Sequence, residues 1–261
     1  MTQVPVRSGA ELDLMRKSGI ITAAALRKAL VEAKTGISLV EIDQIAEKEI
    51  LRLGGKPSFK TVPGYFWTTC LTVNDEVVHG IPRDIVLKAG DVLSVDVGAI
   101  YQGWHTDSAW SILVGEEEID SREREDKLKF LRVGEQALWS AVSQAVNGKR
   151  IGDISSSLQT VIEGSGFSVV KNLTGHGVGR SPHEEPEIPG FGTKGRGLEV
   201  KTGMTLAIEA IYTKGKDEIF EKDDGWTLAS RDGSLGGLFE MSVIVGPKKA
   251  EVITDWRNGD S

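Results

Sequence analysis

The sequence is poor in cysteine and histidine and has no long apolar run, and each shortage excludes a class of protein. A single cysteine, Cys70, excludes an intrachain disulfide and a zinc site built on cysteine pairs, and it suits a reducing compartment. No stretch is long enough to span a bilayer, and the N-terminal residues contain no apolar signal segment. The net charge of −7 disfavours a nucleic-acid surface. We therefore expect a cytoplasmic protein that neither enters a membrane nor reads nucleic-acid sequence.

Three acidic residues stand out because each lies inside a short apolar stretch with the composition of a buried strand. They are Asp96 in residues 92–97, Glu209 in residues 205–210 and Glu240 in residues 238–243. A buried carboxylate is costly unless an opposite charge compensates it, and a divalent cation is a common compensation. Because side chains alternate between the faces of a strand, Asp96 and Glu209 share their faces with small residues, which leave room for ions and a ligand.

The two halves of the sequence resemble each other weakly. At an offset of 112 residues, the aligned pairs are Leu26 with Leu138, Ala33 with Ala145, Gly36 with Gly148, Ile42 with Ile154, Ile50 with Ile162 and Gly54 with Gly166. Both segments have the pattern of helix, glycine break and helix, and Ser38 with Glu41 predicts a capping box. At an offset of 113, residues 90–96 align with residues 203–209, so Asp96 corresponds to Glu209. We expect halves of about residues 10–120 and 121–250, with the site where they meet.

Two polar segments interrupt this pattern. Residues 115–127 are strongly acidic, and we interpret them as a solvated link into a helix that begins at Leu128. Residues 182–197 hold three prolines and four glycines, which predicts a long loop.

Histidine is scarce, with four residues in the chain, and two of them lie in one glycine-rich stretch. His176 and His183 belong to residues 174–186, where the glycines let the main chain approach a ligand closely. A single imidazole among carboxylates suits Mn, Fe(II), Co or Zn. His79 stands at a turn-like exit from an apolar run, and taken alone it indicates a core or surface histidine.

Asp107 adds a fourth carboxylate, and the charge balance then favours two ions. Taken singly, Asp107 could be a turn residue and Glu209 could pair with an arginine. Together, four carboxylates carry four negative charges, which two divalent cations would neutralise, whereas one cation would leave a surplus of buried charge. Water between two such ions becomes acidic enough to supply hydroxide near neutral pH. The predicted ligand set is Asp96, Asp107, His176, Glu209 and Glu240.

These residues lie in motifs that resemble those of type I methionine aminopeptidases, which are pita-bread metallopeptidases. The matching motifs are residues 74–82 (NDEVVHGIP), the Asp96 and Asp107 pair eleven residues apart, residues 175–179 (GHGVG), residues 183–186 (HEEP), Ile208 with Glu209, and Phe239 with Glu240. The resemblance covers nearly the whole chain. It implies an α+β fold of two pseudo-symmetric halves, with antiparallel sheet inside and helices outside, as a single catalytic domain over residues 1–261.

The resemblance also implies an activity. It is the removal of the N-terminal methionine from nascent proteins and peptides, with a preference for a small second residue, by attack of a metal-activated hydroxide on the first peptide bond. Two divalent ions, from among Co, Mn, Fe(II) and Zn, would be the cofactors. The resemblance implies a monomer whose partners are nascent N-termini, and it leaves a contact with the ribosome exit region open.

Each candidate residue receives a role by resemblance. Asp96 would bind one metal ion, His176 and Glu209 would bind the other, and Asp107 and Glu240 would bridge both. Glu209 would also act as the acid/base carboxylate.

Two further histidines and three pocket residues complete the implied site. His79 would place the scissile amide or its leaving nitrogen, and His183 would donate a hydrogen bond to the developing oxyanion. Tyr65, Cys70 and Trp226 match positions that line the family's methionine pocket, and a thioether fits such an aromatic, thiol-lined space. Without the resemblance, Trp226 would indicate ordinary packing.

Three departures from the family pattern concern the pocket and leave the metal ligands intact. Pro182 replaces a common aromatic residue before the second loop histidine, and Met241 replaces a common histidine after the last glutamate. Residues 59–63 differ from the smaller version, bearing cysteine or tyrosine, of familiar bacterial members.

Other proteins are alternatives. An X-Pro aminopeptidase or dipeptidase of the same fold would use the same ligands, but such relatives usually carry a large N-terminal domain, whereas here only about ten residues precede the first predicted helix. The type II methionine enzyme usually has a helical insertion between the positions of His176 and Glu240, which the sequence has no space for. A non-catalytic binding protein of this fold would typically lack ligands. A dinuclear phosphoesterase would not explain the motifs at His79 and His183.

Overall fold

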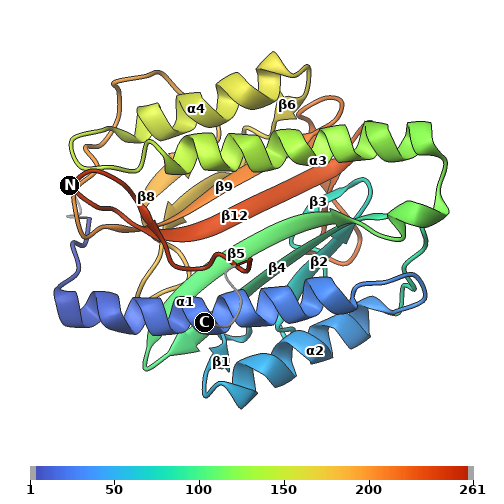
Figure 1. Cartoon of the computed structure of the whole chain (residues 1–261), viewed down its shortest axis with the longest axis horizontal. Helices are drawn as coiled ribbons and strands as arrows, with labels where there is room; N and C mark the ends of the chain where they lie inside the picture. Colours follow the sequence, from blue (N-terminus) through green and yellow to red (C-terminus); the bar gives the residue numbers. More distant parts are fainter. Residues whose placement is uncertain (1–3, 258–261) are drawn as a thin grey trace.

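The computed structural model describes residues 4–257, in which helices cover one face of a large antiparallel sheet (Figure 1). The helices are α1 (Gly9–Glu32), α2 (Leu39–Arg52), α3 (Ser121–Val142) and α4 (Ile151–Gly164), with 3-10 turns η1 (Phe59–Thr61) and η2 (Glu116–Glu118). Helix α1 packs on β4 and β5, and α3 packs on β9 and β12. Among the described residues, no helix has the length and apolar character needed to cross a membrane.

The main sheet has the strand order β1-β4-β5-β12-β9-β7-β8, with β2 paired to β4, β6 to β9 and β13 to β12. Its strands are β1 (Lys56–Pro57), β2 (Thr69–Val73), β4 (Val92–Tyr101), β5 (Trp104–Leu113), β6 (Ser168–Val169), β7 (Thr174–Gly177), β8 (Glu184–Pro189), β9 (Thr205–Thr213), β12 (Gly236–Ile244) and β13 (Glu251–Val252). A smaller sheet has the order β10-β11-β3, from β10 (Ile219–Glu221), β11 (Leu228–Ser230) and β3 (Glu76–Val78). The three predicted strands that carry acidic residues are confirmed as β4, β9 and β12.

The core lies between the helices and the covered face of the sheet. Leu93, Val95 and Val97 of β4 are fully buried in one cluster with Leu26 of α1 and Leu138 of α3. Because residues two apart share a face, Ser94, Asp96 and Gly98 point to the opposite face. Val92, which the sequence placed on that face, instead belongs to the same core cluster as Leu93 at the start of the strand.

Capping side chains set the helix starts. The Ser38 hydroxyl accepts the Glu41 N–H, and the Glu41 carboxylate accepts the Ser38 N–H, so the predicted capping box is present at α2. The predicted start of the next helix at Leu128 is wrong. The Asp120 carboxylate accepts the N–H of Arg122, and α3 already begins at Ser121. An exposed acidic first turn is compatible with a helix because its N-terminal dipole favours negative charge.

The predicted loop over residues 182–197 is also wrong in part, because it contains β8. This strand ends the main sheet and pairs only with β7 among the described strands. An edge position tolerates Pro186 and Pro189, since a missing N–H on the outer side breaks no pairing. The proline content of the segment therefore concealed a strand.

Three pairs of glycines that the two sequence halves align have the same unusual main-chain conformation. The φ angles are 94° and 84° at Gly36 and Gly148, 80° and 84° at Gly54 and Gly166, and 89° and 88° at Gly90 and Gly203. Positive φ favours glycine, so each pair marks the same kind of turn at equivalent places. We propose on this basis that the chain is duplicated, with halves of about residues 10–120 and 121–250; the single catalytic domain likewise stays a prediction.

Candidate metal centre

Strand register brings three of the predicted carboxylates into one row across the sheet. Asp96 on β4 pairs with Ala109 on β5, Ala109 pairs with Glu240 on β12, and Glu240 pairs with Glu209 on β9. Directly paired residues of antiparallel strands point to the same face. The row therefore lies on the face turned away from the helices.

A second row lies beside the first. Asp107 is two residues from Ala109 on β5 and shares its face. The Asp107 N–H donates to the Ser242 hydroxyl at 2.9 Å, Ser242 pairs with Ala207, and Ala207 pairs with His176 on β7. The fourth carboxylate and the imidazole thus join the other three carboxylates.

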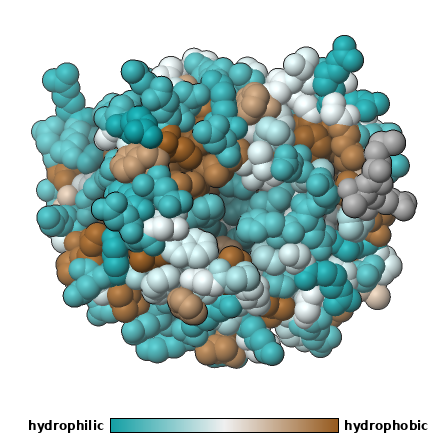
Figure 2. Space-filling model, turned by 180° about the vertical axis from the view of Figure 1, so that it is seen from behind, coloured by the Kyte–Doolittle hydropathy of each residue, from teal (hydrophilic) through white to brown (hydrophobic). Residues whose placement is uncertain are grey.

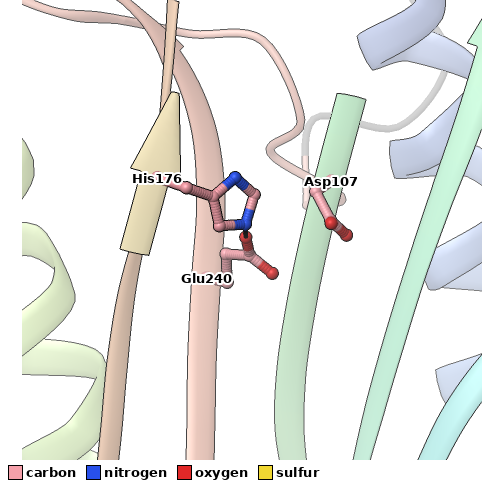
Figure 3. A group of neighbouring side chains, drawn as sticks. All are labelled: Asp107, His176 and Glu240. Atoms are coloured by element: carbon pink, nitrogen blue, oxygen red, sulfur yellow. Dashed lines mark ion pairs between the residues drawn. The ribbon is translucent and has the colours of Figure 1, made fainter. Parts of the chain in front are cut away.

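The tightest group comprises Asp107, His176 and Glu240, each of which offers one ligand atom within 4.8 Å of the others (Figure 3). The His176 Nε2 atom lies 3.8 Å from Glu240 Oε1 and 3.9 Å from Glu209 Oε1. The three side chains come from β5, β7 and β12, so the group exists only in the folded sheet. Such separations between ligand atoms suit a cation held among them.

A cavity of about 320 Å³ opens over both rows. The face turned away from the helices is hollowed near its centre (Figure 2). Every site residue predicted from the sequence lines this cavity: Tyr65, Cys70, His79, Asp96, Asp107, His176, His183, Glu209, Trp226 and Glu240. Its size is at the small end of ligand pockets in proteins, which fits a single side chain and its amide.

The carboxylates are strongly perturbed by their shared burial. Burial raises the pKa of Asp96, Asp107 and Glu240, with the neighbouring carboxylates adding to the effect on Asp96 and Glu240. Burial and the charge of Asp107 raise the pKa of Glu209 to about 8. Four acids cannot all ionise here without a compensating charge, which is the condition that divalent cations meet.

The imidazole of His176 is in the neutral form that a metal ligand requires. Burial lowers its pKa to about 4. Its Nδ1 lies 3.0 Å from the carbonyl oxygen of Gly177, and a carbonyl can only accept, so Nδ1 carries the proton. The lone pair of Nε2 then faces Glu209 and Glu240, as in metal sites where an outer hydrogen bond fixes the imidazole.

The residues present fit divalent cations. Two carboxylate oxygens, Asp96 Oδ1 and Glu240 Oε1, are buried without a hydrogen-bond partner among the described residues. Buried polar atoms are normally satisfied, and such an orphan calls for an explanation. Carboxylate oxygens with one imidazole nitrogen form a donor set that binds Mn, Fe(II), Co or Zn.

His79 and His183 border the cavity where solvent reaches them. His79 follows β3 with a φ of 59°, a conformation that is uncommon outside glycine. Although its ring is accessible through the cavity, the surrounding protein desolvates it and lowers its pKa. The ring centroid of His183 lies 4.5 Å from that of His176, in an edge-on arrangement. Both histidines can therefore reach a group bound over the carboxylates.

One wall of the cavity is apolar. Phe59, Tyr65 and Cys70 form a buried cluster, with Trp226 packed against it and its ring centroid 5.0 Å from that of Tyr65. Burial raises the pKa of the Cys70 thiol, so it remains protonated and behaves as a small apolar group. Phe59 occupies the position that departs from the family pattern, and it belongs to this wall.

A buried carboxylate outside the cavity, Asp43, accepts hydrogen bonds from the segment that forms this apolar wall. Asp43 of α2 accepts the N–H groups of Thr68 and Thr69 at 2.9 and 2.8 Å and the Thr69 hydroxyl at 2.8 Å, while the Tyr65 hydroxyl donates to the Thr69 carbonyl at 2.7 Å. We expect Asp43→Ala to lower the free energy of unfolding by about 2–4 kcal/mol, because it strands several buried donors. Urea unfolding measures this, and a loss below about 0.5 kcal/mol, as at ordinary surface sites, would contradict it.

The matched variant Asp43→Asn keeps a carbonyl acceptor and removes the charge. Burial raises the pKa of Asp43 above its unfolded value, so the folded wild type binds more protons and loses stability as the pH rises from about 4 through that raised pKa. The stability of Asp43→Asn relative to wild type should therefore increase with pH over this window. A difference that stays constant across urea titrations at several pH values would contradict this assignment.

Several residues that line the cavity were missed in the sequence. Thr174, Ile211 and Leu238 are each two positions from a predicted ligand on the same strand and line the cavity. The alternation of side chains could have identified them. Asn172 and Leu173 belong to the loop before β7, where no pattern marks them.

The fourth histidine, His105, is not among the residues that line the cavity. It lies two residues before Asp107 on β5, is 7% exposed, and its Nδ1 lies 2.8 Å from the Ser58 hydroxyl. We therefore assign it no role in the site.

Known proteins match the chain closely. Residues 13–246 match metallopeptidase family M24. The chain is 38% identical over 244 residues to the methionine aminopeptidase of Clostridium perfringens and 39% identical over 244 residues to methionine aminopeptidase 1 of Bacillus subtilis, each alignment covering 94% of this chain and 96% of the relative. The crystal structure of methionine aminopeptidase from Thermotoga maritima superposes with a TM-score of 0.91 at 38% identity, covering 97% of this chain and 99% of that one.

The fold and site define a metallopeptidase of the pita-bread class. The chain belongs to metallopeptidase family M24 and, within it, to the methionine aminopeptidases. The prolidase from Pyrococcus furiosus superposes with a TM-score of 0.75 at 22% identity, covering 95% of this chain and 65% of that one, which shows a shared fold alone. The predicted family, fold and enzyme class are confirmed.

Proposed function

We propose that this chain hydrolyses the first peptide bond of nascent proteins and peptides that begin with methionine, with a preference for a small second residue. One observation carries the proposal: four carboxylates and an imidazole meet in two rows of the sheet, beside an apolar pocket with a thiol and aromatic rings. The rows supply a hydrolytic centre, and the pocket suits an unbranched thioether side chain.

The two rows would hold two divalent ions of Co, Mn, Fe(II) or Zn. Asp96 would bind one, His176 and Glu209 the other, and Asp107 and Glu240 both. When bound, such ions polarise a carbonyl and make water acidic enough to act as a nucleophile near neutral pH. Four carboxylates balance the charge of two divalent ions, which favours two over one.

The chain's own side chains would handle the protons and the orientation. Glu209 would take a proton from the attacking water at a carboxylate oxygen and return it to the leaving nitrogen. His79 would hold the scissile amide, and His183 would donate a hydrogen bond to the developing oxyanion. The methionine side chain would lie against Tyr65 and Trp226, which fixes the first residue in the cavity.

A comparison of two peptides tests this function. Purified protein, stripped of metal and reloaded with Co(II) or Mn(II), is offered Met-Gly-Met-Met and a matched X-Pro peptide. We expect free methionine from the first peptide and no cleavage of the second. Cleavage of the X-Pro peptide alone would instead assign the chain to the X-Pro peptidases of the same fold.

The finer features of the biological setting belong to this proposal and rest on the resemblance. We propose a monomer that works in the cytoplasm on emerging N-termini; a contact with the ribosome exit region stays open.

A further inference from the structure

A partly buried ion pair joins the N-terminal segment to the turn that carries His183. The Arg7 N–H donates to the carbonyl of Gly203 at 2.9 Å, which ties the segment to the turn before β9. The Arg7 guanidinium pairs through Nη2 with Glu184 Oε2, and the two side chains are only 10% and 15% exposed. An arginine and a carboxylate so far from solvent interact more strongly than a surface pair.

The same carboxylate closes the turn between β7 and β8. Glu184 Oε1 accepts the N–H of Arg180 at 2.6 Å and the N–H of Ser181 at 3.1 Å. Since His183 lies between Ser181 and Glu184, these bonds fix the main chain on both sides of its side chain. The turn conformation therefore depends on the position of one carboxylate, which Arg7 holds from the other side.

The guanidinium packs closely against Gly179 and Trp104. A Cβ at Gly179 would lie 2.3 Å from Arg7 Nη2, so a side chain at this position would displace the guanidinium. The fully buried Trp104 ring has Arg7 at 5.0 Å and Arg180 at 3.9 Å from its centroid. A planar guanidinium in such a slot sets the direction of its hydrogen bonds, which a flexible ammonium does not.

We propose that Arg7 is a positioning residue for His183. It acts through Glu184 on the turn that presents the imidazole to the cavity, and none of the described residues of its own segment, from Val4 onward, lines the cavity. The inference rests on the proposed function, in which His183 donates to the oxyanion. A small displacement of such a donor is expected to reduce turnover, with little effect on the binding of the methionine side chain.

A double-mutant cycle on kcat tests the inference at saturating metal. Arg7→Ala is expected to lower kcat about tenfold with little change in KM, and Arg7→Lys to recover part of the loss. His183→Ala is expected to lower kcat by about 10²-fold. In the His183→Ala background, Arg7→Ala should change kcat less than about twofold, because the group that it positions is gone.

The exposed pair of Arg16 and Glu251 supplies a matched control. These side chains are 38% and 46% exposed and 2.7 Å apart, and Arg16→Ala is expected to leave kcat unchanged. Two results would overturn the inference: a wild-type kcat in Arg7→Ala, or an equal fold loss with and without His183, which would indicate a structural role.

Two further comparisons keep the test decisive. If Arg7→Ala does not fold, Glu184→Gln replaces it in the double-mutant cycle, and the same changes in kcat are expected. Glutamine keeps the shape of the glutamate side chain but cannot form the ion pair with Arg7. If the wild type releases no methionine, the proposed function fails. If the wild type is active, His183→Ala is impaired and Arg7→Ala is normal, only the inference about Arg7 fails.

Discussion

Asp107→Asn is expected to lower kcat for methionine release by about 10³-fold, equivalent to about 4 kcal/mol in the barrier. Asp107 is 5% exposed, its N–H is fixed by Ser242, and its carboxylate lies in the group with His176 and Glu240. A carboxylate can give one oxygen to each of two ions, whereas an amide offers one weak oxygen ligand. The substitution keeps the shape of the side chain, so the fold should remain.

Steady-state rates at saturating Mn(II) measure this effect, and thermal unfolding checks the fold. Asp13→Asn makes the same chemical change on α1, where the carboxylate is 69% exposed, and should leave kcat unchanged. A kcat for Asp107→Asn within about tenfold of wild type at saturating metal would refute the bridging role, because transition-state ligands normally contribute more than that.

Glu209→Gln is expected to lower kcat by about 10²- to 10⁴-fold, the range of general acid–base catalysis. Glu209 ends the row of three carboxylates, next to His176, and its side chain is 11% exposed. Glutamine has the same shape but cannot take up a proton from water near neutral pH. The variant thus removes a proton carrier while it leaves the surrounding strands in place.

A titration with metal separates the two proposed roles of Glu209. If Glu209 were only a ligand of one ion, unlike the bridging Asp107, excess metal would refill the site and restore the rate, whereas a lost proton carrier leaves kcat low at any metal concentration. The matched control is Glu187→Gln on β8, where the glutamate is exposed. Full recovery of kcat in Glu209→Gln at high metal would contradict its acid/base role.

The position of three candidate ligands in buried strands could be predicted because buried carboxylates are rare in apolar strands. Asp96, Glu209 and Glu240 each lie in a strand whose other face is core, and that pattern is visible in the sequence. The row itself could not be predicted. It depends on the pairing of Ala109 with Glu240, which joins strands about 130 residues apart, and no local pattern sets such a register.

The errors have local causes. An acidic first turn concealed the start of α3, because charge alone does not distinguish a solvated helix face from a linker. Prolines concealed β8, since an edge strand tolerates them.

The contact between Arg7 and Glu184 could not be predicted for a different reason. The two residues lie 177 positions apart, so their contact is a property of the folded chain and carries no sequence signal.

A titration of Mn(II) into metal-stripped protein tests the central claim most directly. The protein concentration is kept well above the dissociation constants for Mn(II), and the release of methionine from Met-Gly-Met-Met is measured at each step. The proposed dinuclear centre of Asp96, Asp107, His176, Glu209 and Glu240 predicts no release before metal is added and a rate that levels off near two ions per chain. Full release from the stripped protein, or a rate that levels off at one ion per chain, would contradict it.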